Sequence, residues 1–172
     1  MPRIGVQTHL LGMPTKIWPA DRWREVLRGV LELRPGAEIL LFEPAAEAAG
    51  LLIDSRIIPV GGFDIAQAIW LVQEGLDCLI SVDSWSKYPA AAAGIPQVII
   101  VPDQRADYPQ LTPASLWRHE FAPLHHRPEV HLLGLDAVSG YQFGRMDALT
   151  PGMVLEAFRR MNGDPVGAGN GP

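Results

Sequence analysis

The sequence contains one cysteine, no excess of positive charge and no long uninterrupted apolar run. Cys78 has no second cysteine to pair with, which excludes an internal disulfide and a thiolate metal site and favours a reducing, cytoplasmic environment. Lys and Arg number 14 against 19 Asp and Glu, so we expect no diffuse basic surface for nucleic acid. The longest uncharged stretch, residues 88–102, is interrupted by prolines and a glycine and is shorter than the ~20 apolar residues that span a bilayer. We therefore expect no membrane span, and no secretion signal at the N-terminus.

Several motifs that would assign an enzyme class are also missing. There is no G-x-G-x-x-G or Walker A pattern, which argues against a dinucleotide-dependent dehydrogenase and a P-loop kinase. The G-x-S-x-G pattern of α/β-hydrolases is absent as well. The histidines of the second half lack the spacing of metal ligands: His119, His125, His126 and His131. We expect no metal ion and no cofactor.

Short apolar runs alternate with amphipathic segments along most of the chain. Runs that read as buried strands cover residues 4–7, 38–42, 56–60, 78–82, 97–101 and 130–133. Strands that are apolar on both faces and alternate with helices indicate parallel βαβ units with helices on both faces of the sheet. The predicted fold class is therefore α/β, a doubly wound parallel sheet of about six strands with flanking helices.

Local signals place the helices between these strands. Apolar residues recur at helical spacing between residues 23 and 31, and Asp64 is a candidate N-cap for the helix after the third strand. Alanines 90–93 suit a helix closed by Gly94, and Thr150-Pro151 marks the start of a final helix ending near Met161. Residues 103–128 read as a long loop with a short helix at 114–117. One domain over residues 1–161 and a disordered tail over 162–172 are expected.

Two loops at the predicted carboxyl ends of strands carry polar groups, and ligands of open parallel sheets bind at that edge. The loop after the first strand offers Thr8, His9 and the ammonium of Lys16. The segment 83–88 follows the fourth strand and precedes the alanine helix, whose N-terminus favours an anion, with Ser84 and Ser86 as further donors. The plainer alternatives are that Lys16 is a solvated surface charge and that Asp83 and Ser84 only cap a helix. Large aromatics such as Trp85 commonly serve packing alone.

Three segments together resemble one family. Lys16-Ile17-Trp18-Pro19 is similar to a K-x-W-P motif, and Val82-Asp83-Ser84 with Ala90 to Pro96 is similar to D-[ST]-G-x-x-H-x-A-x-A-x-G-x-P. Residues 146–155 are similar to the last helix of the same domain. The chain thus resembles, over nearly its whole length, the C-terminal, donor-binding half of the GT-B glycosyltransferases related to the lipopolysaccharide heptosyltransferases, glycosyltransferase family 9. That half is a Rossmann-like domain.

The resemblance implies a nucleotide-diphosphate sugar as donor substrate. Lys16 would contact the donor phosphates, and Ser84 with the N–H groups after Asp83 would cradle the diphosphate. An acidic residue after the second strand would hold the ribose, with Glu43 as the nearest candidate and Glu47 as the second.

The sequence also departs from the family pattern. Trp85 stands where the family has glycine and Tyr88 where it has histidine, while Lys87 is available as a substitute phosphate contact. The family places the acceptor site and the general base on an N-terminal half, so we expect sugar transfer only with such a half, and self-association where that half is missing. The alternative is a non-catalytic module that acts through protein contacts.

Overall fold

The computed structural model describes residues 1–8, 16–101, 124, 127, 129–136, 142–143 and 147–163. Within them lies a six-stranded parallel sheet with the order β3-β2-β1-β4-β5-β6. Its strands are β1 (Arg3–Gln7), β2 (Glu38–Leu41), β3 (Ile57–Pro59), β4 (Cys78–Val82), β5 (Gln97–Ile100) and β6 (Val130–Leu133). A two-stranded antiparallel sheet pairs β7 (Leu135–Asp136) with β8 (Gln142–Phe143).

The strand order reverses between β1 and β4. From β1 the chain winds outward to β2 and β3, and from β4 it winds the other way to β5 and β6. This doubly wound arrangement confirms the predicted fold class. Because β1 and β4 are neighbours in parallel register, with Gln7 beside Ser81, the loops after them leave from the same edge of the sheet.

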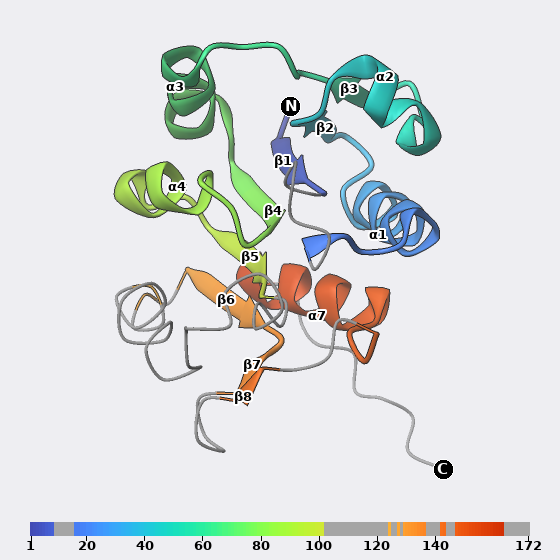
Figure 1. Ribbon diagram of the computed structural model, residues 1–172, viewed down its shortest axis with the longest axis vertical. Helices are drawn as coiled ribbons and strands as arrows, with labels where there is room; N and C mark the ends of the chain where they lie inside the picture. The colour runs from blue at the N-terminus through green and yellow to red at the C-terminus, as the bar shows by residue number, and fades with distance from the viewer. Residues whose placement is uncertain are drawn as a thin grey trace.

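Helices cover both faces of the sheet (Figure 1). On one face lie α1 (Ala20–Leu33) and α7 (Pro151–Met161), and on the other lie α3 (Ile65–Gly75) and α4 (Lys87–Ala93). The short α2 (Ala45–Ala48) and the 3₁₀ turn η2 (Ala49–Leu51) follow β2. In the described residues, no helix combines the length and the apolar character needed to cross a membrane.

Alternation along the strands divides the core between the two faces. Ile39 and Leu41 pack with α1 and α7, whereas Leu40 between them packs with Val72 of α3. Successive strand side chains point to opposite faces, so strands that are covered on both sides carry apolar residues at every position. The larger cluster also contains Trp23 of α1 and Phe158 of α7, each almost fully buried.

The predicted strands agree with the structure to within one residue at each end. Asp64 caps α3 in a capping box with Gln67, and Thr150 caps α7 with Pro151 in its first turn, as predicted. Gly94 ends α4 in the left-handed region, with φ of 71°. The predicted loop at 103–128 and its helix at 114–117 lie outside the described residues, apart from Leu124 and Arg127.

One helix start was predicted wrongly. Helix α4 begins at Lys87, three residues before Ala90, so Lys87 and Tyr88 lie on the helix and not in the preceding loop. Pro89 does not prevent this, because the first turn of a helix needs no intrahelical N–H donor. The loop after β4 therefore shortens to residues 83–86.

The boundary of the C-terminal tail stays a prediction. Asn162 closes α7, because its backbone N–H and its side-chain amide both donate to the Phe158 carbonyl. Residues 164–172 lie outside the described residues.

Candidate functional site

The loops after β1, β2 and β4 bring together polar side chains that are distant in sequence. Thr8 follows β1, Glu43 follows β2, and Asp83 follows β4. Each of these three residues is at least 96% buried, and so are Ser84, Ser86 and Lys87. Lys16 is 5% exposed, which excludes the alternative of a solvated surface charge. Of the residues predicted for the site, His9 lies outside the described residues.

Asp83 joins two lysines. Lys16 Nζ donates to Asp83 Oδ2 and to the Asp83 backbone oxygen, both at 2.9 Å, and Lys87 Nζ is paired with Oδ1. Burial alone would raise the pKa of Asp83, but the ammonium groups of Lys87 and Lys16 outweigh it and hold that pKa below its ordinary value. With both lysines protonated, the cluster carries one excess positive charge beneath the surface.

The same two residues are the only lysines of the chain, whose other basic side chains are all arginine. Lys87 is the first residue of α4, and Asp83 lies four residues earlier in the loop after β4. Lys87 was predicted to be a loop residue because the predicted start of α4 was too late. The scarcity of lysine was the signal that could have singled Lys87 out as a partner of Asp83.

A second network joins β1 to the turn after β4. The Ser84 hydroxyl donates to Gln7 Oε1, and the Ser86 hydroxyl donates to the same oxygen at 2.8 Å. The two hydroxyl oxygens lie 3.0 Å apart. Ser86 is the N-cap residue of α4 but its side chain makes no capping hydrogen bond. Ser84 Oγ also accepts the Ser86 N–H at 3.4 Å, but capping is not the only role of Asp83 and Ser84, since their side chains bind Lys16, Lys87 and Gln7.

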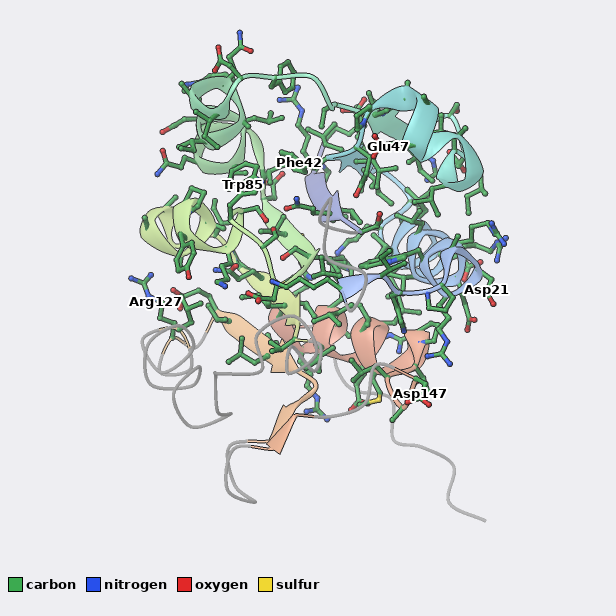
Figure 2. The ribbon with its side chains drawn as sticks, in the orientation of Figure 1. Asp21, Phe42, Glu47, Trp85, Arg127 and Asp147 are labelled. Atoms are coloured by element: carbon green, nitrogen blue, oxygen red, sulfur yellow. The ribbon has the colours of Figure 1, made fainter. Side chains whose placement is uncertain are left out.

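Glu43 ties the end of β2 to the end of β1. The Thr8 backbone N–H and the Thr8 hydroxyl both donate to Glu43 Oε1, at 2.6 and 2.8 Å. Of the two carboxylates predicted for the ribose, Glu43 is thus buried within this edge of the sheet, whereas Glu47 is exposed on α2 (Figure 2).

An aromatic cavity adjoins these networks. Phe42 and Trp85 lie edge to face, with ring centroids 6.4 Å apart (Figure 2). They line a cavity of about 300 Å³ together with Val60, Gly61, Gly62, Phe63, Ile65 and Ala68. Trp85 was expected at the site from the sequence, whereas Phe42 and the glycine pair were not, although the sequence shows Gly-Gly directly after a predicted strand.

The turn at Gly61 and Gly62 holds one wall of this cavity in place. The Gly61 N–H donates to the Glu43 carbonyl at 3.1 Å, and a Cβ at Gly61 would lie 2.2 Å from the Pro44 nitrogen. Gly62 has φ of 96°, where side chains are strained. Both positions therefore need glycine, one for close approach and one for backbone conformation.

The described part of the chain offers neither a reactive thiol nor a cluster of metal ligands. Cys78 is buried in β4, and burial raises the pKa of its thiol to about 12, so it is an inert thiol at neutral pH as predicted. No group of three or more His, Cys, Asp or Glu side chains within the described ranges could hold a metal ion.

Comparison with known proteins gives a result at the level of the fold. No family model matches the sequence, and no curated protein sequence matches it. Among solved structures, E. coli ADP-heptose LPS heptosyltransferase II superposes with a TM-score of 0.64 at 21% identity, over 93% of this chain and 46% of that chain. E. coli heptosyltransferase WaaC with ADP superposes with a TM-score of 0.66 at 16% identity, over 93% of this chain and 44% of that one.

The chain thus spans less than half the length of either heptosyltransferase. Identities this low establish a common fold and not a common activity. The predicted resemblance is confirmed in that sense: this chain has the fold of one half of a heptosyltransferase of the GT-B type.

Proposed function

We propose that this domain binds a nucleoside diphosphate sugar and supplies the donor side of a glycosyl transfer. The observation that carries the proposal is that the aromatic cavity and the buried two-lysine cluster share the segment after β4, where Trp85 lines the cavity two residues after the lysine-bound Asp83. A nucleotide needs both, because its base is flat and largely apolar and its diphosphate is anionic. One of the structures with this fold is described as holding ADP.

Two dipeptides link the apolar and the polar parts of the site. Phe42 lines the cavity and its neighbour Glu43 lies in the polar network, while Trp85 lines the cavity and its neighbour Ser84 lies against Gln7. A base in the cavity that Phe42 and Trp85 line would have its ribose near Glu43. Its phosphates then face Ser84 and the lysines.

The lysines stabilise the negative charge of the diphosphate. Lys16 uses two N–H donors on Asp83, and an ammonium group has three. The remaining N–H is available to a phosphate oxygen. During sugar transfer the diphosphate leaves with added negative charge, which a fixed buried ammonium stabilises more strongly than water does.

Asp83 is unsuited to act as the general base. A carboxylate with a lowered pKa is a weak proton acceptor at neutral pH, and Lys16 and Lys87 already occupy both of its oxygens. The proposal therefore assigns deprotonation of the acceptor hydroxyl to a second, N-terminal-type half.

Calorimetric titration with ADP, GDP and UDP, and then with their sugar conjugates, tests donor binding. We expect one nucleotide to bind and Lys16→Met to weaken it by about tenfold to a hundredfold, the usual effect of losing a charge-assisted hydrogen bond. Arg28→Met removes an exposed cation from α1 and serves as the control. Equal affinity in Lys16→Met and the wild type, with both folded by circular dichroism, contradicts the assignment of Lys16.

A non-catalytic module remains the second candidate, and Trp85 is the observation that favours it. Its ring fills space beside Phe42 where the resembling family has glycine, and the Ser84 and Ser86 hydroxyls are already engaged by Gln7. Absence of binding by any nucleotide, with binding gained in Trp85→Gly, supports this candidate. Sugar transfer after addition of an N-terminal half excludes it.

A further inference from the structure

Helix α3 has an unusual composition for a helix at the surface. Its only charged residue is Glu74, and most of its other residues are apolar. Helices that are apolar on all sides are normally buried on all sides. Here only Ala68 and Val72 are buried, against Leu40, Leu79 and Ala90.

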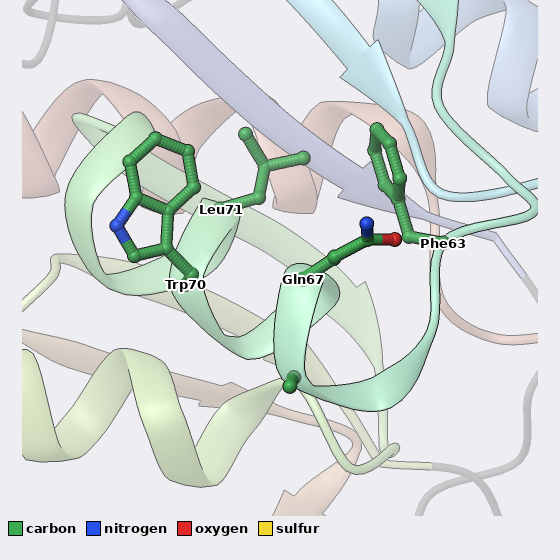
Figure 3. Close-up of a pocket in the computed structure, with 5 residues that line it drawn as sticks. Phe63, Gln67, Trp70 and Leu71 are labelled. Atoms are coloured by element: carbon green, nitrogen blue, oxygen red, sulfur yellow. The ribbon is translucent and has the colours of Figure 1, made fainter.

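The opposite side of α3 and the turn before it expose three large apolar side chains. Trp70 and Ile65 are each 64% exposed and Phe63 is 49% exposed. Figure 3 shows the Trp70 and Phe63 rings on either side of Gln67. Phe63, Ala66, Gln67, Trp70 and Leu71 line an open hollow of about 420 Å³. We call these five residues the α3 hollow.

The surroundings of the α3 hollow carry almost no charge. From residue 59 to residue 73 the only charged side chain is Asp64, and its carboxylate accepts the Gln67 N–H at 2.8 Å in the capping box. An ionic partner therefore has nothing to pair with. Two copies of this surface, in contrast, meet with only the two capping Asp64 carboxylates as like charges.

The exposed aromatic area is a large share of what a dimer needs. Phe63 and Trp70 alone leave roughly 250 Å² to solvent on each copy, given the usual size of these side chains. A stable interface buries about 800 Å² per partner, with aromatic residues at its centre. Two residues thus provide about a third of one side.

We propose that a second copy of this chain covers the α3 hollow. The two α3 helices pack antiparallel about a two-fold axis near Gln67, and Trp70 of each copy enters the space between Phe63 and Ala66 of the other. The exposed Trp70 ring and the space beside Ala66, one helical turn away, lie on the same surface. An interface between two identical patches requires that each patch carry both the protruding group and the space that receives it. Phe63 lines both the α3 hollow and the Phe42–Trp85 cavity, whereas Trp70 lines the hollow and not the cavity. Variants of Trp70 therefore test the dimer separately from nucleotide binding.

Sedimentation equilibrium of the whole chain tests the dimer. We expect the wild type to shift to twice its mass of 18.8 kDa as its concentration rises, and Trp70→Glu to remain at 18.8 kDa. Met153→Glu, which places the same charge at an exposed apolar position on α7, is the matched control and should dimerise as the wild type does. Wild-type protein that stays monomeric at a few hundred micromolar overturns the proposal. A dimer that persists in a folded Trp70→Glu chain also overturns it.

Cross-linking locates the interface independently. Ala66→Cys lies in the α3 hollow close to the proposed axis, and Ala92→Cys is an exposed helical control on α4. The native Cys78 is buried and does not compete. Mild oxidation should link Ala66→Cys chains into disulfide dimers at least tenfold more efficiently than Ala92→Cys chains. Equal efficiency of the two variants contradicts this interface.

Discussion

Lysine occurs only twice in this chain, and both lysines meet at one carboxylate. Lys16, Lys87 and Asp83 are each at most 5% exposed, so water screens their interactions little. Buried charges are tolerated when they are paired and hydrogen-bonded, and they become costly when a partner is removed. The Asp83 cluster is therefore both the candidate anion site and a point on which folding depends.

Asp83→Asn leaves two buried ammonium groups without a counter-charge. We expect it to lower the free energy of unfolding by about 3–5 kcal/mol, measured by urea denaturation. Replacing the whole cluster by Lys16→Met, Asp83→Leu and Lys87→Met together should recover most of this loss, because no unpaired charge remains. Similar instability in the triple variant would argue that shape, and not charge, is what Asp83 contributes.

The pKa of Asp83 makes a specific prediction about acid. Because the pKa is lower in the folded chain than in the unfolded chain, the stability that Asp83 contributes is complete at neutral pH. It is lost as the pH falls below about 4, the ordinary pKa of an unfolded Asp, towards the folded value.

We expect the free energy of unfolding of the wild type to fall more steeply with decreasing pH in this range than that of Asp83→Asn. Asp54, whose pKa Arg56 lowers to about 2, and His131, whose pKa burial lowers, are the same in both proteins and cancel in the comparison. Parallel pH profiles from chemical denaturation would contradict a charged, lysine-bound Asp83.

Among the elements, the turn between β3 and α3 is tightly constrained in its sequence. Gly61 approaches the backbone of residues 43 and 44, and this contact fixes the carboxyl end of β2 relative to the start of α3. The same turn forms one wall of the Phe42–Trp85 cavity.

Gly61→Ala should therefore destabilise the chain by about 1–3 kcal/mol, because its Cβ meets backbone that has no rotamer to adjust. Gly36→Ala is the matched control, since a Cβ there has no heavy atom within 4 Å. Thermal unfolding of both variants checks the difference, and equal melting temperatures would show that residues 43 and 44 move aside.

Helix α3 depends on its cap more than a fully packed helix does. Its side chains are buried on one side only, and the Asp64 carboxylate satisfies the Gln67 N–H. We expect Asp64→Ala to cost about 1 kcal/mol and Asp64→Asn to cost much less, because asparagine also caps helices well. Urea denaturation with both variants distinguishes the cap from a general effect of charge.

At the scale of the whole molecule, the helix layers on the two faces of the sheet differ in the large apolar side chains that they expose to solvent. Helices α1 and α7 bury Trp23 and Phe158 against one face, whereas the layer of α3 and α4 on the other face leaves Trp70 and the neighbouring Phe63 exposed. A half of a GT-B fold with this arrangement has its core complete on one side and an apolar surface on the other. That surface is the one we assign to a second copy.

Removal of residues 164–172 should leave the melting temperature of the domain unchanged. Helix α7 is already closed at Asn162 by hydrogen bonds to the Phe158, Arg159 and Arg160 carbonyls. Thermal unfolding of a chain that ends at Gly163 tests this. A drop of several degrees would show that the tail contributes contacts to the fold.

The element order and most helix caps could be predicted because their signals are local. The Gln97–Ile100 strand is recognisable from its own β-branched run, and Asp64 caps the segment that directly follows it. The start of α4 was missed because Pro89 resembles a breaker until its place in the first turn is known.

The sequence by itself determined the doubly wound α/β fold, since strands apolar on both faces and separated by amphipathic helices have few other ways to bury their surface. It also placed candidate residues at the strand ends. Only the tertiary structure decided which of them meet: Lys16 with Asp83 across 67 positions, and Thr8 with Glu43 across 35. Likewise, only packing decided that Phe42 faces Trp85 and that Trp70 faces solvent. The spacing of apolar residues indicates whether a segment forms a helix or a strand. Contacts between segments depend on strand order and helix placement, which the sequence of a single segment does not determine.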